Sequence, residues 1–298
     1  MVSPEGLKIR LWLAENAKKT FAAQSIEESR ANLKALADKR PLPDGTSLEP
    51  ELASGVPCEW VSALGAAPDK VIIFLHGGGY TIGTGKACRS LVSMISAASG
   101  CRGLVPEFRQ APEHPFPAAV DDVTAVYRWL LEQGFPSRGI VMAGESAGGG
   151  LALAALVALR NEGDAPPSCG VLLSPWTDLA CSGDSMTTKV DTDPMNDLAT
   201  AKRFASLYAD QTDLHHPLIS PLYAQFGGLP PLLIQIGTDE MFLDDALRVA
   251  EKAKTAGVEV TLERYEGMWH AWHHFAPQMP EARQAIEQIG RYIGRKKG

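Results

Sequence analysis

The chain has 298 residues, a formal net charge of −7 and hydrophobic residues at 45% of its positions. This length fits one globular domain with a sizeable core, and the acidic balance argues against nucleic-acid binding. The first residues lack the apolar run of a secretory signal, and no stretch approaches the roughly 20 apolar residues of a membrane span. The 5 cysteines have no metal-ligand spacing, which favours free thiols. We therefore expect a cytoplasmic protein with no membrane partner, metal or cofactor.

Most of the chain alternates between buried strands and helices. Residues 1–45 come first and read as two amphipathic helices, near Glu5–Lys18 and Ile26–Leu36. The alternation that follows predicts an α/β fold with a mostly parallel sheet and helices on both faces. It is interrupted at about 182–218 by a segment with one helical stretch, Asp197–Tyr208. The predicted strands are Val56–Val61 as an antiparallel edge, then Val71–Leu75, Gly103–Phe108, Ile140–Ala143, Val171–Ser174, Leu232–Gly237 and Val258–Tyr265.

Gly144-Glu145-Ser146-Ala147-Gly148 follows one predicted strand and opens a long helix-forming stretch. A strand, a tight turn carrying serine and then a helix is the setting of a nucleophile elbow, in which small neighbours leave the serine hydroxyl exposed above the sheet. The turn also places Ser146 at a helix N-terminus, where backbone amides favour developing negative charge. Ser146 is therefore the candidate nucleophile.

A second glycine-rich turn, His76-Gly77-Gly78-Gly79-Tyr80, follows the predicted strand Val71–Leu75. Without a Cβ, Gly78 and Gly79 can bring their amides close to a substrate. Together with the amide of Ala147 they predict an oxyanion hole for a tetrahedral intermediate. His76 and Gly77 in this loop, and Glu145 beside the serine, are assigned to supporting the two turns.

A serine nucleophile needs a base and an acid that orients the base. Asp239 and His270 each follow a strand in the last third of the chain, at the sheet edge where α/β folds place their chemistry. Their order after Ser146 is the α/β-hydrolase order.

Other residues compete for both positions. Glu240, Asp244 and Asp245 are neighbouring carboxylates, but the two aspartates fit the first turn of a helix. Glu240 would point away from Asp239 if the segment is extended. His273 and His274 follow His270 closely, while His114 reads as a structural loop residue. We favour Asp239 and His270.

Four motifs together resemble the hormone-sensitive-lipase family of esterases, the bacterial type IV group of the α/β-hydrolase fold. They are His76–Gly79, Arg109–Ala119, Gly144–Gly149 and Ser174–Leu179. The resemblance implies Ser146 as nucleophile, Asp239 as acid, His270 as base, and Gly78, Gly79 and Ala147 as oxyanion donors.

The resemblance also implies a domain organisation. Residues 1–45 and about 182–218 would form a helical cap over a catalytic domain of residues 46–298. Members of that family often dimerise through the strand that corresponds to 258–265, so a homodimer through this strand is expected from the resemblance alone. Trp12, Leu13, Met186, Met195 and Phe204 are candidates to wall the acyl pocket.

The predicted activity is hydrolysis of short- to medium-chain acyl esters, with lactones as a further substrate class, through an acyl-enzyme intermediate. An amidase or deacetylase would use the same triad. A non-catalytic receptor on this fold is a third reading, but the presence of His270 argues against it. Two departures from the family pattern blur the subfamily and hence the substrate: Glu145 stands where many members carry Asp, and Glu-Met-Phe-Leu-Asp follows Asp239 where many read Pro-Leu-x-Asp.

Overall fold

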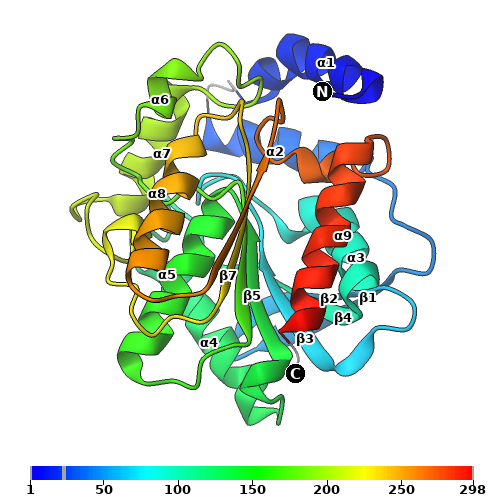
Figure 1. Cartoon of the computed structure of the whole chain (residues 1–298), viewed down its shortest axis with the longest axis vertical. Helices are drawn as coiled ribbons and strands as arrows, with labels where there is room; N and C mark the ends of the chain where they lie inside the picture. The colour runs from blue at the N-terminus through cyan, green and yellow to red at the C-terminus, as the bar shows by residue number, and fades with distance from the viewer. Residues whose placement is uncertain (1, 22–24, 297–298) are drawn as a thin grey trace.

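A central sheet of eight strands organises the protein (Figure 1). The structure is a computed structural model that describes residues 2–21 and 25–296. The strand order is β1-β2-β4-β3-β5-β6-β7-β8, and every neighbouring pair from β4 to β8 is parallel. The strands are β1 (Ser47–Ala53), β2 (Val56–Ser62), β3 (Ala67–Leu75), β4 (Cys101–Pro106), β5 (Ile140–Glu145), β6 (Cys169–Leu173), β7 (Leu232–Gly237) and β8 (Val260–Tyr265).

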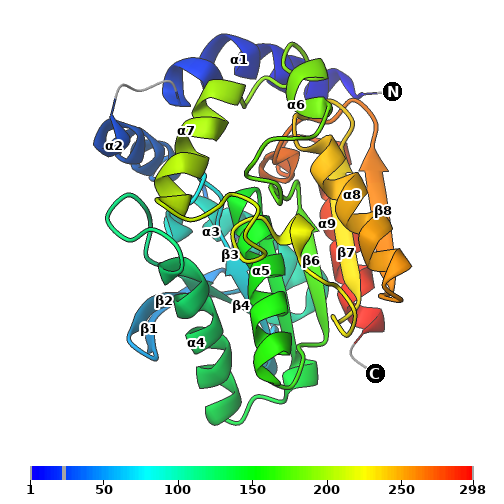
Figure 2. The ribbon, with the colours of Figure 1, turned by 90° about the vertical axis from the view of Figure 1, so that its left-hand side faces the viewer.

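Helices cover both faces of the sheet, as Figures 1 and 2 show. One face carries α3 (Gly85–Ser99) and α9 (Pro280–Arg295), which pack on each other. The other carries α4 (Ala118–Glu132), α5 (Ala147–Glu162) and α8 (Leu243–Thr255). The middle strands β5, β6 and β7 are buried along their whole length, which is why they read as continuous apolar runs.

The predicted α/β architecture is confirmed, with one correction at the sheet edge. All six predicted parallel strands exist, and their limits differ by a few residues. The antiparallel strand near Val56–Val61 is also present, but it is not the edge strand, because β1 pairs with its outer side. The sequence of β1 carries two glutamates and a proline and has little apolar alternation, so it gave no strand signal. β8 forms the opposite edge, and the homodimer through residues 258–265 stays a prediction.

Four helices lie together beyond the carboxyl ends of the parallel strands (Figure 2). These covering helices are α1 (Pro4–Phe21), α2 (Ile26–Ala37), α6 (Ser185–Thr188) and α7 (Leu198–Ala209). They come from the two segments that lack the βα alternation, and the three helices predicted there are confirmed. Among the helices of the described residues, none is both long and apolar enough to cross a membrane.

Candidate active site

Ser146 sits on a strained turn between β5 and α5. Its φ and ψ are 56° and −126°, a conformation that non-glycine residues rarely adopt. The turn is held from both sides, because the Ser146 amide donates to the Leu173 carbonyl at 2.9 Å and its carbonyl accepts from the Trp176 amide at 2.9 Å. A Cβ on Gly148 would lie 2.1 Å from the Leu75 carbonyl oxygen, so the turn requires glycine there. The predicted strand, turn and helix around Ser146 are confirmed, and its role as nucleophile stays a prediction.

The glycine-rich loop after β3 faces the same cavity as Ser146. Gly78 and Gly79 have positive φ angles of 111° and 60°, and a Cβ on Gly79 would meet the ring of Phe204 on α7. His76 braces the loop: its ring stacks on Phe108 at 4.3 Å, and its Nδ1 lies 2.8 Å from the Gly77 carbonyl oxygen. In residues 2–21 and 25–296, no protein group accepts a hydrogen bond from the amides of Gly78, Gly79 or Ala147. These amides are available to an oxyanion.

The carboxylate beside His270 belongs to Glu240 and not to Asp239. His270 Nδ1 lies 2.9 Å from Glu240 Oε2, whereas Asp239 Oδ2 accepts from Arg10 Nη1 at 2.6 Å. The prediction of Asp239 as the partner of His270 is therefore wrong. The prediction assumed that the chain stays extended after β7. The backbone makes a turn there instead, and this turn directs the carboxylate of Glu240 towards His270.

Burial and hydrogen bonding together set the charge of this pair. Burial raises the pKa of Glu240, and the hydrogen bond and positive charge of His270 act against that shift. Burial alone would lower the pKa of His270, but the hydrogen bond and charge of Glu240, together with the charges of Asp193 and Glu145, raise the pKa above its usual range. His270 thus binds a proton more readily than a free imidazole does, which suits a general base.

His273 and His274 are engaged elsewhere. His273 Nε2 lies 2.9 Å from Gln235 Oε1, and burial lowers the pKa of this imidazole to about 3. His274 bridges Glu145 Oε1, at 2.9 Å, and the guanidinium of Arg40, at 2.7 Å. Burial would raise the pKa of Glu145, but His274, together with Arg40 and His270, outweighs burial and lowers the pKa to about 2. Glu145 is thus a buried carboxylate beside the elbow, and its supporting role stays a prediction.

Ser174, just after β6, contacts Glu240 and the residue that follows His270. Its hydroxyl donates to Glu240 Oε1 at 2.9 Å and accepts from the amide of Ala271 at 3.2 Å. The Gly237 amide also donates to Glu240 Oε1, at 2.6 Å. Both carboxylate oxygens of Glu240 are thus occupied, and its orientation is fixed. In the sequence Ser174 begins the Ser174–Leu179 motif and ends a predicted strand, and a serine at the carboxyl end of a parallel strand is the signal that could have identified it.

A cavity of about 160 Å³ joins these groups. Ser146, His270, Gly78 and Gly79 line it, and Met195 and Phe204 form part of its wall as predicted. Three other predicted wall residues lie elsewhere. Trp12 is 52% exposed on the outer side of α1, while Leu13 and Met186 are buried in the two hydrophobic clusters that flank the sheet. The remaining apolar lining comes from Leu33, Ile82, Ala87, Trp176, Ala201, Phe242 and Ala271.

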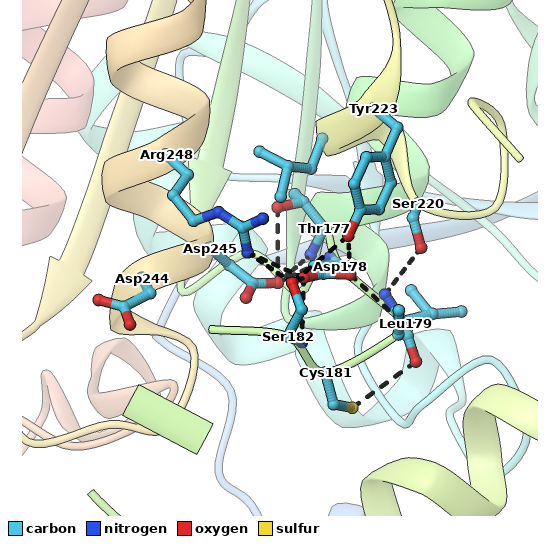
Figure 3. Close-up of polar contacts among 12 residues, drawn as sticks. Thr177, Asp178, Leu179, Cys181, Ser182, Ser220, Tyr223, Asp244, Asp245 and Arg248 are labelled. Atoms are coloured by element: carbon cyan, nitrogen blue, oxygen red, sulfur yellow. Dashed lines mark hydrogen bonds and ion pairs between the residues drawn. The ribbon is translucent and has the colours of Figure 1, made fainter. Parts of the chain in front are cut away.

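Figure 3 shows a buried polar cluster around Asp178 and Asp245. The wall residue Trp176 contacts this cluster, because its indole Nε1 donates to the Asp178 carbonyl at 3.2 Å. Asp178 accepts from Tyr223, Ser182 and Arg248, and Asp245 on α8 accepts from the amides of Thr177 and Asp178 at 2.7 and 2.8 Å. Both carboxylates have 0% exposure. These bonds fasten the start of the 182–218 segment to α8, the helix that follows Glu240.

Comparison with known proteins agrees with this geometry. The family model for the alpha/beta hydrolase fold matches residues 72–274. The acetyl-hydrolase of Streptomyces hygroscopicus is 45% identical over 236 residues, which are 79% of this chain and 78% of the relative. The putative acetyl-hydrolase LipR of Mycobacterium tuberculosis is 34% identical and covers 92% of this chain and 89% of its own. A crystal structure of an esterase from the bacterial hormone-sensitive lipase family superposes with a TM-score of 0.96, at 43% identity over 100% of both chains.

The sheet order, the elbow and the family match define an α/β hydrolase. Full-length similarity then gives the narrower assignment. The chain belongs to the hormone-sensitive-lipase family of bacterial esterases, a family of carboxylic ester hydrolases.

Proposed function

We propose that this protein is a serine carboxylesterase for short- to medium-chain acyl esters, and that it works through an acyl-enzyme intermediate. One observation carries the proposal: Ser146 on a strained elbow and His270, which is paired with the buried Glu240, line the same small, largely apolar cavity. A nucleophile, a base and an orienting acid in one cavity are the parts that acyl transfer requires.

In the proposed mechanism His270 takes the proton of Ser146 as the hydroxyl oxygen attacks the ester carbonyl. The carbonyl oxygen becomes an anion and is stabilised by the amides of Gly78, Gly79 and Ala147. His270 then protonates the departing alcohol. Water, activated by the same imidazole, attacks the acyl-serine and releases the acid. Glu240 holds the ring in place and stabilises the imidazolium that forms.

The covering helices are proposed to act as the cap of this site. Leu33 on α2 and Phe204 on α7 line the cavity, so substrates reach Ser146 between helices from residues 1–45 and 182–218. A wall of this kind stabilises an acyl chain by about 0.8 kcal/mol for each methylene that it buries, until the chain meets a side chain it cannot displace. The rings of Phe204 and Phe242, which line the cavity, would limit the length of the acyl chain.

The test uses p-nitrophenyl esters of increasing acyl length beside emulsified long-chain triglyceride. Activity should rise from acetyl to butyryl or hexanoyl and fall steeply by about twelve carbons. Ser146→Ala should remove nearly all turnover, by up to about 10⁶ in kcat, and a phosphonate reagent should label Ser146. A maximum at twelve carbons or beyond, or a preference for triglyceride, would refute the short-chain part. Full activity of the Ser146 variant would refute the mechanism.

A further inference from the structure

The start of the first covering helix is fastened to the catalytic half of the molecule. The Ser3 amide and hydroxyl donate to the carboxylate of Glu281 on α9, at 2.5 and 2.9 Å. Val2 packs against Gly267, where an added Cβ would lie 2.5 Å from the valine side chain. Leu13, further along α1, is 3% exposed and belongs to the hydrophobic core. The helix is therefore held above the site along this part of its length.

Arg10 extends from the middle of α1 and joins three loops that are distant in sequence. Its Nη1 donates to Asp239 Oδ2 at 2.6 Å and to the Gly267 carbonyl at 3.3 Å. Its Nη2 donates to the Thr192 carbonyl at 2.9 Å. The ion pair is half-buried, with 25% of the Arg10 side chain and 21% of the Asp239 side chain exposed. Water screens such a pair only in part.

Each of the three loops leads directly to the active site. Asp239 precedes Glu240, and Gly267 lies three residues before His270. Thr192 precedes Asp193, whose carboxylate accepts from the Met241 amide at 3.0 Å and from the Met195 amide at 2.8 Å. The backbone is thus held on both sides of Glu240, by Arg10 through Asp239 and by Asp193 through Met241. Met195 lines the substrate cavity.

We infer that Arg10 is a positioning residue for the acid–base pair, and that α1 and the Arg10–Asp239 ion pair keep the Glu240 and His270 loops in register with each other and with the cavity wall. The inference rests on the proposed roles of Glu240 and His270. It also gives Asp239 a function: this carboxylate connects the covering helix to the acid loop. A misplacement of about 1 Å at reacting groups can cost about 10²-fold in rate, so loss of this connection should be visible in turnover.

The test compares variants of the ion pair with a control that loosens α1 elsewhere. Arg10→Gln, Arg10→Lys, Asp239→Asn and the double variant Arg10→Gln/Asp239→Asn report on the pair. Glu281→Gln removes the carboxylate that holds Ser3 and touches none of the three loops. For each protein, kcat and KM are measured with p-nitrophenyl butyrate, and the unfolding midpoint is measured alongside.

Arg10→Gln and Asp239→Asn should each lower kcat about five- to tenfold, with a smaller change in KM. The double variant should be no worse than the more impaired single variant, because both remove the same interaction. Arg10→Lys, which keeps the charge but not the forked geometry, should recover part of the loss. Glu281→Gln should lower the unfolding midpoint and leave kcat of the folded protein within about twofold.

Two results would overturn the inference: equal kcat in Arg10→Gln and Glu281→Gln, or losses that multiply in the double variant. The first would mean that Arg10 only stabilises α1, and the second that the two side chains act separately. Failure of the proposed function would look different. In that case the wild type would not hydrolyse the ester, or Ser146→Ala would retain its activity, whatever happened at Arg10.

Discussion

The nucleophile side and the acid–base side of the active site are built in different ways. Ser146 is positioned mainly by its own neighbourhood, a strand, a turn and a helix that follow each other in the chain, with glycines where backbones nearly touch. Glu240 and His270 lie on two separate loops whose contacts come from distant segments. Ser174, Arg10 and Asp193 contribute them.

This difference has consequences for how each side responds to substitution. The bonds of the elbow to Leu173 and Trp176 use backbone groups, so the elbow should respond mainly to substitutions within a few residues of Ser146. The acid–base side should respond to substitutions far away in sequence, provided that they touch one of the two loops. Pairs of variants at adjacent or similarly buried positions test this difference.

The largest expected effect on kcat distinguishes variants of two adjacent carboxylates, Glu240 and Asp239. Glu240→Gln keeps the size of the side chain but removes the charge that stabilises the imidazolium, so kcat should fall by about 10³- to 10⁴-fold. Asp239→Asn, one residue earlier, should cost no more than about tenfold, because its carboxylate contacts Arg10 and not His270. Steady-state kinetics on p-nitrophenyl butyrate measures both. The reverse ranking would restore Asp239 as the acid.

The same pair of variants should differ in pH dependence. The wild-type acidic limb of kcat/KM reports His270, whose pKa lies above its usual range because Glu240, with smaller contributions from Asp193 and Glu145, opposes the effect of burial. Glu240→Gln removes that opposing charge while burial remains, so the limb should move to lower pH. Asp239→Asn should leave the limb in place. A limb that does not move in Glu240→Gln would show that Glu240 does not set the pKa of His270.

The sequence predicts the surroundings of Ser146 better than those of Glu240 and His270. The strand, turn and helix around Ser146 and the glycine-rich loop depend on local composition, and the motifs predicted these local structures correctly. The choice between Asp239 and Glu240 depends on the direction of a turn after β7. Groups distant in sequence hold this turn, namely Arg10 on α1, Asp193 in the 182–218 segment and the carbonyl of Met268. Spacing along the chain carries no information about such contacts. β1 was missed for a related reason, because its exposed outer edge selects no apolar alternation.

A smaller effect is expected at Ser174, which touches the acid–base pair without taking part in proton transfer. Ser174→Ala removes a donor to Glu240 Oε1 and the acceptor of the Ala271 amide, so kcat should fall about tenfold. Ser220→Ala is the matched control. Ser220 is equally buried and its hydroxyl also accepts a backbone amide, that of Leu179, but it contacts neither loop of the pair. Similar losses of kcat in both variants would mean that Ser174 is only a structural serine.

The smallest effect on turnover is expected at Asp245, in the buried polar cluster around Asp178 and Asp245 (Figure 3). Burial raises the pKa of Asp245 to about 8, so the folded protein keeps a proton that the unfolded chain releases near pH 4. The stability that this proton confers is complete below about pH 4 and is lost as pH rises towards 8. The free energy of unfolding should therefore decline by up to about 1.4 kcal/mol per pH unit across this window.

Asp245→Asn cannot titrate, so its free energy of unfolding should depend less on pH between about 5 and 8 than that of the wild type. The variant should be the less stable protein at the acidic end, because an amide replaces a well-placed acceptor, and the difference should shrink or reverse towards pH 8. Urea unfolding at several pH values measures this, with Asp244→Asn at the half-buried neighbouring position as the control. The value of kcat should stay within about twofold, since Asp245 contacts neither Ser146 nor the two catalytic loops. Parallel stability profiles for Asp245→Asn and the wild type would show that Asp245 is ionised in the folded protein. The cluster would then hold the 182–218 segment through two charged carboxylates and a single arginine.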